Sequence, residues 1–477
     1  MQLMTKKFKV IFFLCFATVA FAQQDSQSSY KKRVLETTEI EFLSSYYTQD
    51  GNNAAVTGGI GTEELSDFTP TIIVNIPLNA DDVLTVDAGI SAYSSASSSN
   101  LDPFDGNTAA STAGQVYGSP WVASSGASKV DTWVSINSRF SHSSDDRNRI
   151  WNAEISVATE YDYSSIGFGA GYTMLFNNKN TEVGVQANVY LDNWKPRYPT
   201  ELDSYLEVNG NLFDGFFVGI EILDQLGNGI DKTGNSGQIW SPVTNFQLIN
   251  NKARNSYSVS FTLSQILNKD AQLSLFFDLI SQEGWLANPM QRVYFSDIEN
   301  YYIGEAVSIP NYTSPINDNT FQLADDFERL PKSRFKIPIG MRFNYYFNEI
   351  FSLRTYYRYY FDDWGINSHT ANVEFPIKIS QKFTLYPSYR FYNQSEADYF
   401  APYEELISTS EFYTSDYDLS KFTANQYSFG ISYKDLLNNF HIGKFGLKSI
   451  HLKYSSYKRN TGLNANIISG GFKFVLD

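Results

Sequence analysis

Apolar and polar side chains alternate with a period of two along residues 334–394, and this alternation limits the possible folds more than any other feature. Between Phe335 and Phe347 every odd position is apolar or aromatic, while Lys336 and Arg342 stand at even positions. This period is that of a β-strand with one apolar and one polar face. The runs are about 12–14 residues long, which is long for a soluble domain and suits a tilted crossing of a bilayer. Because arginine is rarely buried without a partner, we expect the apolar face to meet lipid and the polar face to meet water.

The same period predicts about sixteen strands along the whole chain. They span residues 34–47, 69–78, 82–93, 129–141, 149–161, 164–176, 179–191, 254–267, 270–281, 334–347, 350–362, 366–380, 382–394, 424–436, 445–458 and 465–477. Links after even-numbered strands are mostly short, with two modest exceptions near 142–148 and 436–444, and the long links all follow odd-numbered strands. The long links are about 48–68, 94–128, 192–253, 282–333 and 395–423.

This sorting of the links distinguishes two kinds of all-β fold. A soluble sandwich has no reason to gather its long loops on one side, whereas outer-membrane barrels have short periplasmic turns and long extracellular loops. We therefore predict a transmembrane antiparallel β-barrel of about 16 strands over residues 34–477. Pro338, Pro376 and Pro387 fall inside predicted strands, where each removes a ladder donor and marks either a bulge or a misplaced strand end.

The N-terminus has the pattern of a secretory signal peptide over residues 1–22. Three lysines precede the apolar run 10–20, and Ala20-Phe21-Ala22 has the small-x-small pattern of a cleavage site. Residues 23–33 are polar, and we expect them to form a flexible N-terminus. The only cysteine, Cys15, lies in this signal, so the mature chain has no disulfide, thiolate metal site or cysteine nucleophile. These features predict export to the outer membrane of a Gram-negative cell.

Charge separates the two halves of the predicted barrel. The formal net charge of −15 argues against nucleic acid as a partner. Period two points acids into the lumen from the early strands: Glu39, Glu41, Asp87, Glu154, Glu160 and Glu182. It points bases inward from the later strands: Lys336, Arg342, Arg354, Arg358 and Arg390. Either the two walls create a transverse field that sorts polar solutes, or they meet and fill the lumen with salt bridges.

Inward tyrosines alternate with the arginines, and they either form a stacking track for a ring or simply fill the lumen. The third long link contains an apolar run, 216–220, which we expect to fold back as a plug of the barrel or to meet a partner.

The sequence supports no catalytic residue, and we predict neither enzymatic activity nor a cofactor. Ser368 and His369 are neighbours in sequence, so a strand turns them to opposite faces and no triad follows. The residues 49–52, and likewise Asp102, Asp105 and Asn107, offer oxygen atoms to calcium but lack the spacing of an EF-hand. Turn formation is the alternative role of these residues, and whether a metal binds is left open.

Three stretches carry a resemblance to a known family: residues 46–51 with 56–65, residues 359–370, and residues 389–400. They resemble a family of large outer-membrane β-barrel-like proteins from Gram-negative bacteria that carries only a domain-of-unknown-function label. Its genes often lie near those of a small lipoprotein and an FAD:protein FMN transferase, which implies an envelope lipoprotein or a flavin-linked redox system as a partner. The motif residues at the predicted extracellular rim are Gln49, Asp50, Gly51, Glu63, Glu64, Trp364 and His369. If they act together, they form a site at that rim.

The function that the sequence predicts is porin- or transporter-like. A barrel surrounded by lipid, with a charged lumen, suits passage or binding of a small polar solute. The alternative is a plugged structural barrel that serves as the partner of an envelope lipoprotein or of a flavin-linked redox system.

Overall fold

The computed structural model describes residues 32–95, 119–121, 131–243, 249, 251–317, 319–435, 437 and 439–476. The predicted signal peptide and most of the second long link lie outside these residues.

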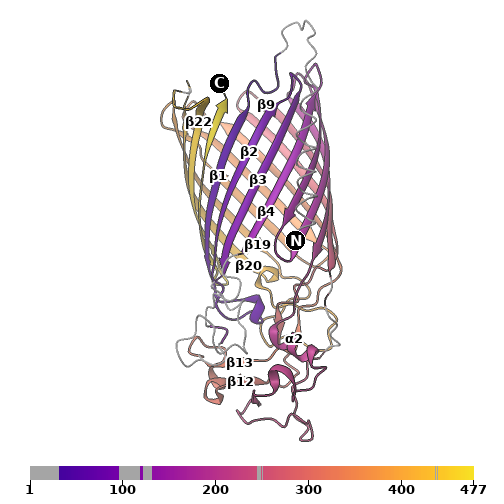
Figure 1. The fold of residues 1–477 in the computed structure, drawn as a ribbon. Helices are drawn as coiled ribbons and strands as arrows, with labels where there is room; N and C mark the ends of the chain where they lie inside the picture. Colours follow the sequence, from indigo (N-terminus) through magenta and orange to yellow (C-terminus); the bar gives the residue numbers. More distant parts are fainter. Residues whose placement is uncertain are drawn as a thin grey trace.

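Sixteen antiparallel strands close into a barrel (Figure 1), which confirms the predicted fold. The strands are β1 (Glu39–Asp50), β2 (Leu65–Pro77), β3 (Asp82–Ser95), β4 (Asp131–Ser143), β5 (Arg149–Thr159), β6 (Tyr163–Phe176), β7 (Thr181–Trp194), β9 (Lys252–Asn268), β10 (Ala271–Gly284), β15 (Ser333–Tyr346), β16 (Ser352–Asp362), β17 (Asn367–Glu374) continued by β18 (Ile377–Lys378), β19 (Phe383–Gln394), β20 (Phe422–Lys434), β22 (Phe445–Arg459) and β23 (Asn464–Leu476). A short β21 (His441–Ile442) pairs with the start of β22. The ring closes where β1 pairs with β23, from Glu39 opposite Val475 to Asp50 opposite Asn464. No strand edge is therefore left open along the wall.

The outer face of the barrel is apolar. On β15, the side chains of Phe335, Ile339 and Met341 are 42–47% exposed. Their cross-strand neighbours on β16 share this outer face, with Met341 opposite Tyr357 and Ile339 opposite Tyr359. Because successive side chains point to opposite faces of a strand, the even-numbered residues of β15 face the lumen. The outward face thus has the apolar character of a lipid-facing surface.

The three prolines have different effects on the ladder. Opposite Pro338 the pairing of β10 with β15 is interrupted at residues 278–279. Pro376 lies in the gap that divides β17 from β18, whereas Pro387 stays inside β19, opposite Phe429. The predicted first strand, 34–47, was displaced: β1 spans Glu39–Asp50, so the boundary prediction was wrong by several residues.

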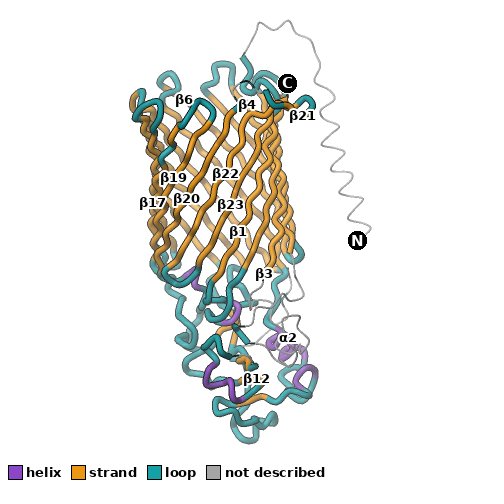
Figure 2. The backbone as a smooth tube through the Cα atoms, turned by 90° about the vertical axis from the view of Figure 1, so that its left-hand side faces the viewer, coloured by secondary structure: helices purple, strands orange, loops and turns teal. Residues whose placement is uncertain are grey.

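The long links gather beyond one end of the barrel and form a folded cap (Figures 1 and 2). Short turns join the strands at the opposite end, as the link lengths predict. The cap contains α2 (Thr200–Glu207), the sheet of β8 (Ile222–Leu223), β12 (Tyr302–Gly304) and β13 (Thr320–Gln322), and the pair β11 (Arg292–Val293) and β14 (Asp326–Phe327). The short 3-10 helices on this side are η2 (Ala55–Thr57), η4 (Gly215–Phe217), η5 (Ala306–Asn311) and η6 (Tyr417–Leu419). None of the described helices is long and apolar enough to cross a membrane.

The cap has its own hydrophobic core. Trp240, Phe217 and Phe321 are at most 1% exposed and lie in one cluster with residues of α2 and of the small sheet. The indole N–H of Trp240 donates to the carbonyl of Ala324 at 3.2 Å. In the apolar run 216–220 only Phe217 is fully buried, while Phe216 and Val218 are more than half exposed. Phe217 and Ile220 of this run pack in the core of the cap, together with α2 and the small sheet.

Candidate functional site: the charged lumen and its capped mouth

The predicted basic residues face the lumen from three neighbouring regions of the wall. Lys336 and Arg342 lie on β15, opposite Asp362 and Tyr356 of β16. The remaining members lie on β16 and β19: Arg354, Arg358 and Arg390. All share the face opposite to the outward Met341 and Tyr357, since alternate residues of a strand share a face.

The predicted acidic residues face the lumen from the other side of the ring. Glu39 and Glu41 lie on β1, and Glu41 shares a cross-strand row with Ile73 and Asp87. Glu154 of β5 and Glu182 of β7 also point inward. The last member, Glu160, follows the end of β5 and accepts a hydrogen bond from the Tyr93 hydroxyl. In the strand order these residues lie roughly half-way round the barrel from the basic residues.

Where one of these charges has an ionic partner, that partner lies one or two strands away along the wall, as Lys448 of β22 does from Glu39. Arg139 pairs with Glu154 at 2.5 Å between β4 and β5, and Arg354 pairs with Glu374 at 3.0 Å between β16 and β17. Glu39 accepts from Lys473 across the closing seam at 2.8 Å. Within the described ranges of the chain, no ion pair joins the predicted acidic wall to the predicted basic wall. The alternative in which salt bridges across the lumen fill the barrel therefore finds no support in the side chains that the structure describes.

Three of the four predicted lumen arginines have no carboxylate partner among the described residues: Arg342, Arg358 and Arg390. The guanidinium of Arg342 lies 5.4 Å from the ring centre of Phe276 and 5.8 Å from that of Tyr356. We call these three residues the arginine cluster.

The mouth of the barrel under the cap holds two cavities. One, of about 320 Å³, is lined by Arg390, Arg459 and several aromatic and amide side chains. The other, of about 260 Å³, is lined by Arg254, Arg334 and Trp364 among others. Asp418, at η6 of the cap, borders both cavities. The cap thus reaches down to the charged wall of the barrel.

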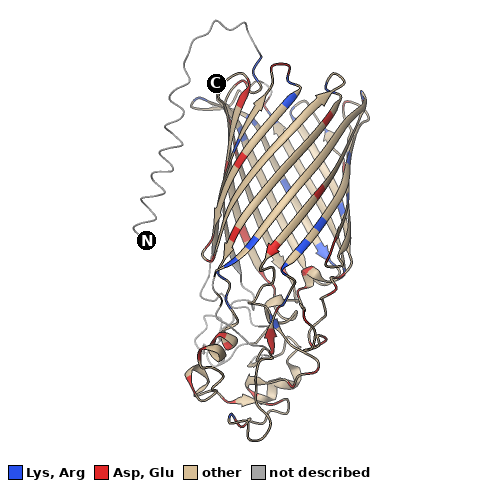
Figure 3. Ribbon diagram, turned by 90° about the vertical axis from the view of Figure 1, so that its right-hand side faces the viewer, with Lys and Arg blue, Asp and Glu red and all other residues tan. Residues whose placement is uncertain are grey.

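The mouth arginines are held in place by acids and aromatic rings. Arg459 donates to Asp418 at 2.6 Å, and Arg334 donates to Asp362 at 2.5 and 2.8 Å. The guanidinium of Arg334 also lies 4.3 Å from the ring centre of Trp364. The predicted lumen residues did not include Arg334 and Arg459, although Arg459 alternates with the outward-facing Leu452 and Tyr454 of β22 and so has inward parity. Figure 3 shows basic and acidic residues along the strands and near this end of the barrel.

Three residues of the predicted rim motif, Gln49, Gly51 and Glu63, contact one another in and beside the first long link. The carboxylate of Glu63 accepts hydrogen bonds from Gln49 Nε2 and from the backbone N–H of Asn53, both at 3.3 Å. A Cβ on Gly51 would lie 2.6 Å from Glu63 Oε2, so a larger residue at this position would displace the carboxylate. Burial raises the pKa of Glu63 to about 7. These three motif residues therefore stabilise the link between β1 and β2.

The other rim motif residues lie elsewhere. Asp50 and Glu64 are exposed, and Trp364 is buried in a cluster with Leu286 and Leu330. His369 is on the outer face of β17, opposite Tyr359, and its Nδ1 lies 2.8 Å from the Tyr357 hydroxyl. Because β19, β20, β22 and β23 separate β17 from β1, the structure does not bring the seven motif residues together into one site.

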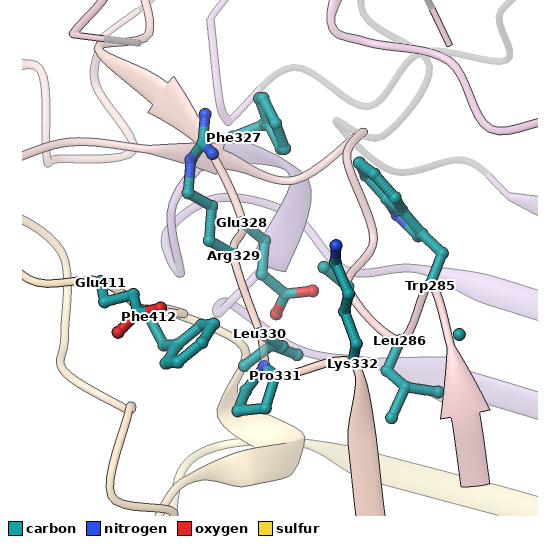
Figure 4. Close-up of a pocket in the computed structure, with 12 residues that line it drawn as sticks. Trp285, Leu286, Phe327, Glu328, Arg329, Leu330, Pro331, Lys332, Glu411 and Phe412 are labelled. Atoms are coloured by element: carbon teal, nitrogen blue, oxygen red, sulfur yellow. The ribbon is translucent and has the colours of Figure 1, made fainter. Parts of the chain in front are cut away.

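A third cavity, of about 520 Å³, lies in the cap where it joins the barrel (Figure 4). Its lining comes from residues 284–287, 327–332 and 411–412, and it includes Trp285 and Phe412. Glu328 borders it and accepts a hydrogen bond from the backbone N–H of Asn288 at 2.6 Å. Burial raises the pKa of Glu328 to about 8. The cavity is therefore an apolar recess with one buried carboxyl group at its edge.

The described ranges contain no group of three or more His, Cys, Asp or Glu residues that could hold a metal ion. The candidate calcium ligands Asp102, Asp105 and Asn107 lie outside the described residues. Ser368 faces the lumen side, opposite Gln394, while His369 faces outward. The two residues thus point apart, as the strand period predicts.

Comparison with known proteins gives a family but no activity. The family model described as "Protein of unknown function (DUF3570)" matches residues 12–472. No curated protein matches the chain.

Several solved structures are similar to the chain. A "Bacterial polysaccharide outer membrane secretin" shares 8% identity at a TM-score of 0.41, with 92% of this chain and 99% of that chain covered. The Pseudomonas putida toluene transporter TodX shares 9% identity at a TM-score of 0.37, with coverage of 93% and 90%. Pseudomonas aeruginosa OccK2 (OpdF), solved in complex with glucuronate, shares 7% identity at a TM-score of 0.38, with coverage of 94% and 98%. At these identities and TM-scores the likeness carries no argument about what the chain binds.

Proposed function

The chain belongs to the DUF3570 family, whose description assigns no function, and we propose from the structure that its barrel passes a small polar solute through the outer membrane of a Gram-negative cell. The apolar outer face supports insertion into lipid, because exposed side chains such as Phe42, Ile72 and Phe168 would otherwise meet water. In this proposal outer-membrane lipid is the surrounding partner and the chain catalyses no reaction.

The observation that carries the proposal is the local pairing of the lumen charges. Ion pairs between neighbouring strands leave each charge on the wall, whereas pairs across the lumen would occupy its centre. A barrel of sixteen strands is wide enough to hold water between its walls. Charged side chains that line water act on a passing solute through their field.

The cap gives the path a selective entrance. A solute from outside meets the cap first, and the cavities beside Asp418 lie between the cap and the lumen wall. Arg254, Arg334 and Arg459 line these cavities together with aromatic rings. Such an entrance favours polar solutes that accept hydrogen bonds from guanidinium groups.

Conductance of the isolated chain in a planar bilayer tests the proposal. The expected result is a steady ionic current in discrete steps, since water and ions share the path of the solute. Folding of the sample is checked first by its resistance to SDS at room temperature. Silence of a folded, inserted sample would contradict passage and would favour the plugged interaction barrel.

A further inference from the structure

We propose that the arginine cluster, Arg342, Arg358 and Arg390, is a binding site for the carboxylate of a small ring-bearing solute. The biological use of this site rests on the proposed function, because the site would define the class of solute that passes through the lumen. The evidence for binding is the arrangement of side chains on one lumen wall.

The strand register brings the three side chains to one patch. Arg342 shares a cross-strand row with Tyr356, Asn372 and Arg390, from β15 through β16 and β17 to β19. Arg358 lies two residues beyond Tyr356 on the same face of β16. Diagonal neighbours in an antiparallel pair are roughly 7–8 Å apart, so Arg342 and Arg358 are close enough to share one small anion. Arg390 is two strands further from Arg358, roughly 10 Å across the sheet, a span that a ring-bearing solute bridges.

The members of the cluster differ from Arg334, Arg354 and Arg459 in their partners. Arg354 on the same strand pairs with Glu374, and Arg334 and Arg459 also pair with carboxylates. The Nε of Arg358 is buried without a hydrogen-bond partner in the described chain. A buried charged donor without an acceptor is costly, so a carboxylate that enters the site would replace a missing interaction.

Arg358 has a second unsatisfied group beside it. Thr370 is directly opposite Arg358, it is fully buried, and its Oγ1 also lacks a partner among the described residues. On the other side Arg358 faces Gly340, which carries no side chain to satisfy it. A guanidinium and a hydroxyl that both lack partners at one spot of the wall fit a ligand with several oxygen atoms.

Aromatic rings frame the cluster and point to a ring in the solute. Phe276 and Tyr356 both lie beside the Arg342 guanidinium, and their rings stack nearly parallel to one another with centres 5.7 Å apart. Tyr392 lies in the row of Arg358, and with Arg390 it lines the cavity of about 320 Å³ under the cap. Ring faces beside a guanidinium bind planar groups by stacking.

The aromatic rings beside the cluster decide between the possible anions. A ring-bearing carboxylate gains both the guanidinium contacts and stacking on these rings, whereas inorganic phosphate gains the guanidinium contacts alone. The site thus fits a carboxylate better than a phosphate, although both match the guanidinium fork.

The test uses benzoate as the probe and the full mature chain in planar bilayers with a chloride gradient. The triple variant Arg342→Gln, Arg358→Gln, Arg390→Gln removes the three charges and keeps a polar side chain at each position. The matched control is Arg354→Gln, on the same wall but already paired with Glu374. We expect benzoate to block the wild-type current, and we expect the triple variant to weaken this block by at least about tenfold.

The outcomes separate this inference from the proposed function. A steady current whose benzoate block and reversal potential are the same in wild type and triple variant would overturn the binding site and leave passage intact. Block that is as strong with inorganic phosphate as with benzoate would overturn the assignment to carboxylates. If the wild type carries no current, calorimetric titration of the detergent-solubilised barrel with benzoate tests binding directly. A heat of binding that is lost in the triple variant and kept in the control supports the site. The absence of a heat of binding in the wild type overturns it.

Discussion

The buried ion pair of the cap offers the sharpest test of how the mouth is held together. Arg292 on β11 is 3% exposed and Glu201 on α2 is fully buried, and Nε and Nη2 donate to the two carboxylate oxygens at 2.6 and 2.9 Å. Arg292 also donates from Nη1 to the carbonyl of Val56 at 3.1 Å, and its guanidinium lies 4.9 Å from the ring centre of Phe321. One side chain thus connects the first, third and fourth long links.

The substitution Arg292→Leu leaves the Glu201 carboxylate buried without its partner. Loss of one member of a buried pair costs roughly 3–5 kcal/mol, and the hydrogen bond to Val56 adds about 1 kcal/mol. Since every 1.4 kcal/mol is about a tenfold change in an equilibrium constant, cap amides should exchange at least roughly 100-fold faster. The barrel strands should keep their protection, because their ladder does not depend on the cap.

Hydrogen exchange read by mass spectrometry on the detergent-solubilised chain measures this effect peptide by peptide. The matched variant Arg292→Leu with Glu201→Leu removes both charges, and by the same reasoning it should recover most of the lost protection. Exchange in β11 that changes less than about threefold in the single variant would refute the ion pair as a stabiliser of the cap. A double variant as labile as the single one would refute the argument that the unpaired carboxylate causes the loss.

Three further predictions follow from the structure. Burial raises the pKa of Glu328 to about 8, so the folded cap holds a proton that the unfolded segment releases near pH 4. Cap protection in hydrogen exchange should therefore fall as pH rises between about 4 and 8. Glu328→Gln should reduce this dependence, and the remainder should come from Asp325, whose pKa burial also raises to about 8. Gly51→Ala places a Cβ 2.6 Å from a buried carboxylate oxygen and should destabilise the first long link by about 1–3 kcal/mol, whereas Gly219→Ala, with no atom within 4 Å, should leave exchange rates unchanged. Arg354→Glu with Arg358→Glu reverses two lumen charges, so reversal potentials should shift toward cations, and an unchanged potential in a conducting barrel would discard the charged-wall hypothesis.

The barrel was predictable because the alternation of apolar and polar side chains is visible within each strand and recurs from strand to strand. The alternation of Phe335 to Phe347 assigns each side chain to lipid or lumen without knowledge of its neighbours, and the register of β15 with β16 agrees with it. The end of a strand is less visible, because the side chains continue to alternate where the chain leaves the ladder. That is why β1 begins at Glu39 and not at residue 34, the start of the predicted first strand.

The cap and the partners of the arginines were not predictable in this way. Glu201 and Arg292 are 91 residues apart in sequence, and neither lies in a stretch with a regular period. Period two likewise placed Arg354 and Arg358 on one face but could not show that only Arg354 has an acidic neighbour, since that depends on which residue of the next strand stands opposite. The rim motif does not form a single site, because Trp364 is buried beneath the cap and His369 faces outward.

The direction in which the arginines point tests the account most directly. With the cysteine of the predicted signal peptide, Cys15, removed or replaced, a single thiol is introduced by Arg358→Cys on the lumen face or by Met341→Cys on the outer face of the neighbouring strand. In reconstituted vesicles we predict that a charged, membrane-impermeant thiol reagent modifies the first variant and spares the second, while a lipid-soluble reagent modifies the second. Modification by the charged reagent at position 341 with protection at position 358 would contradict the assignment of lipid and lumen faces.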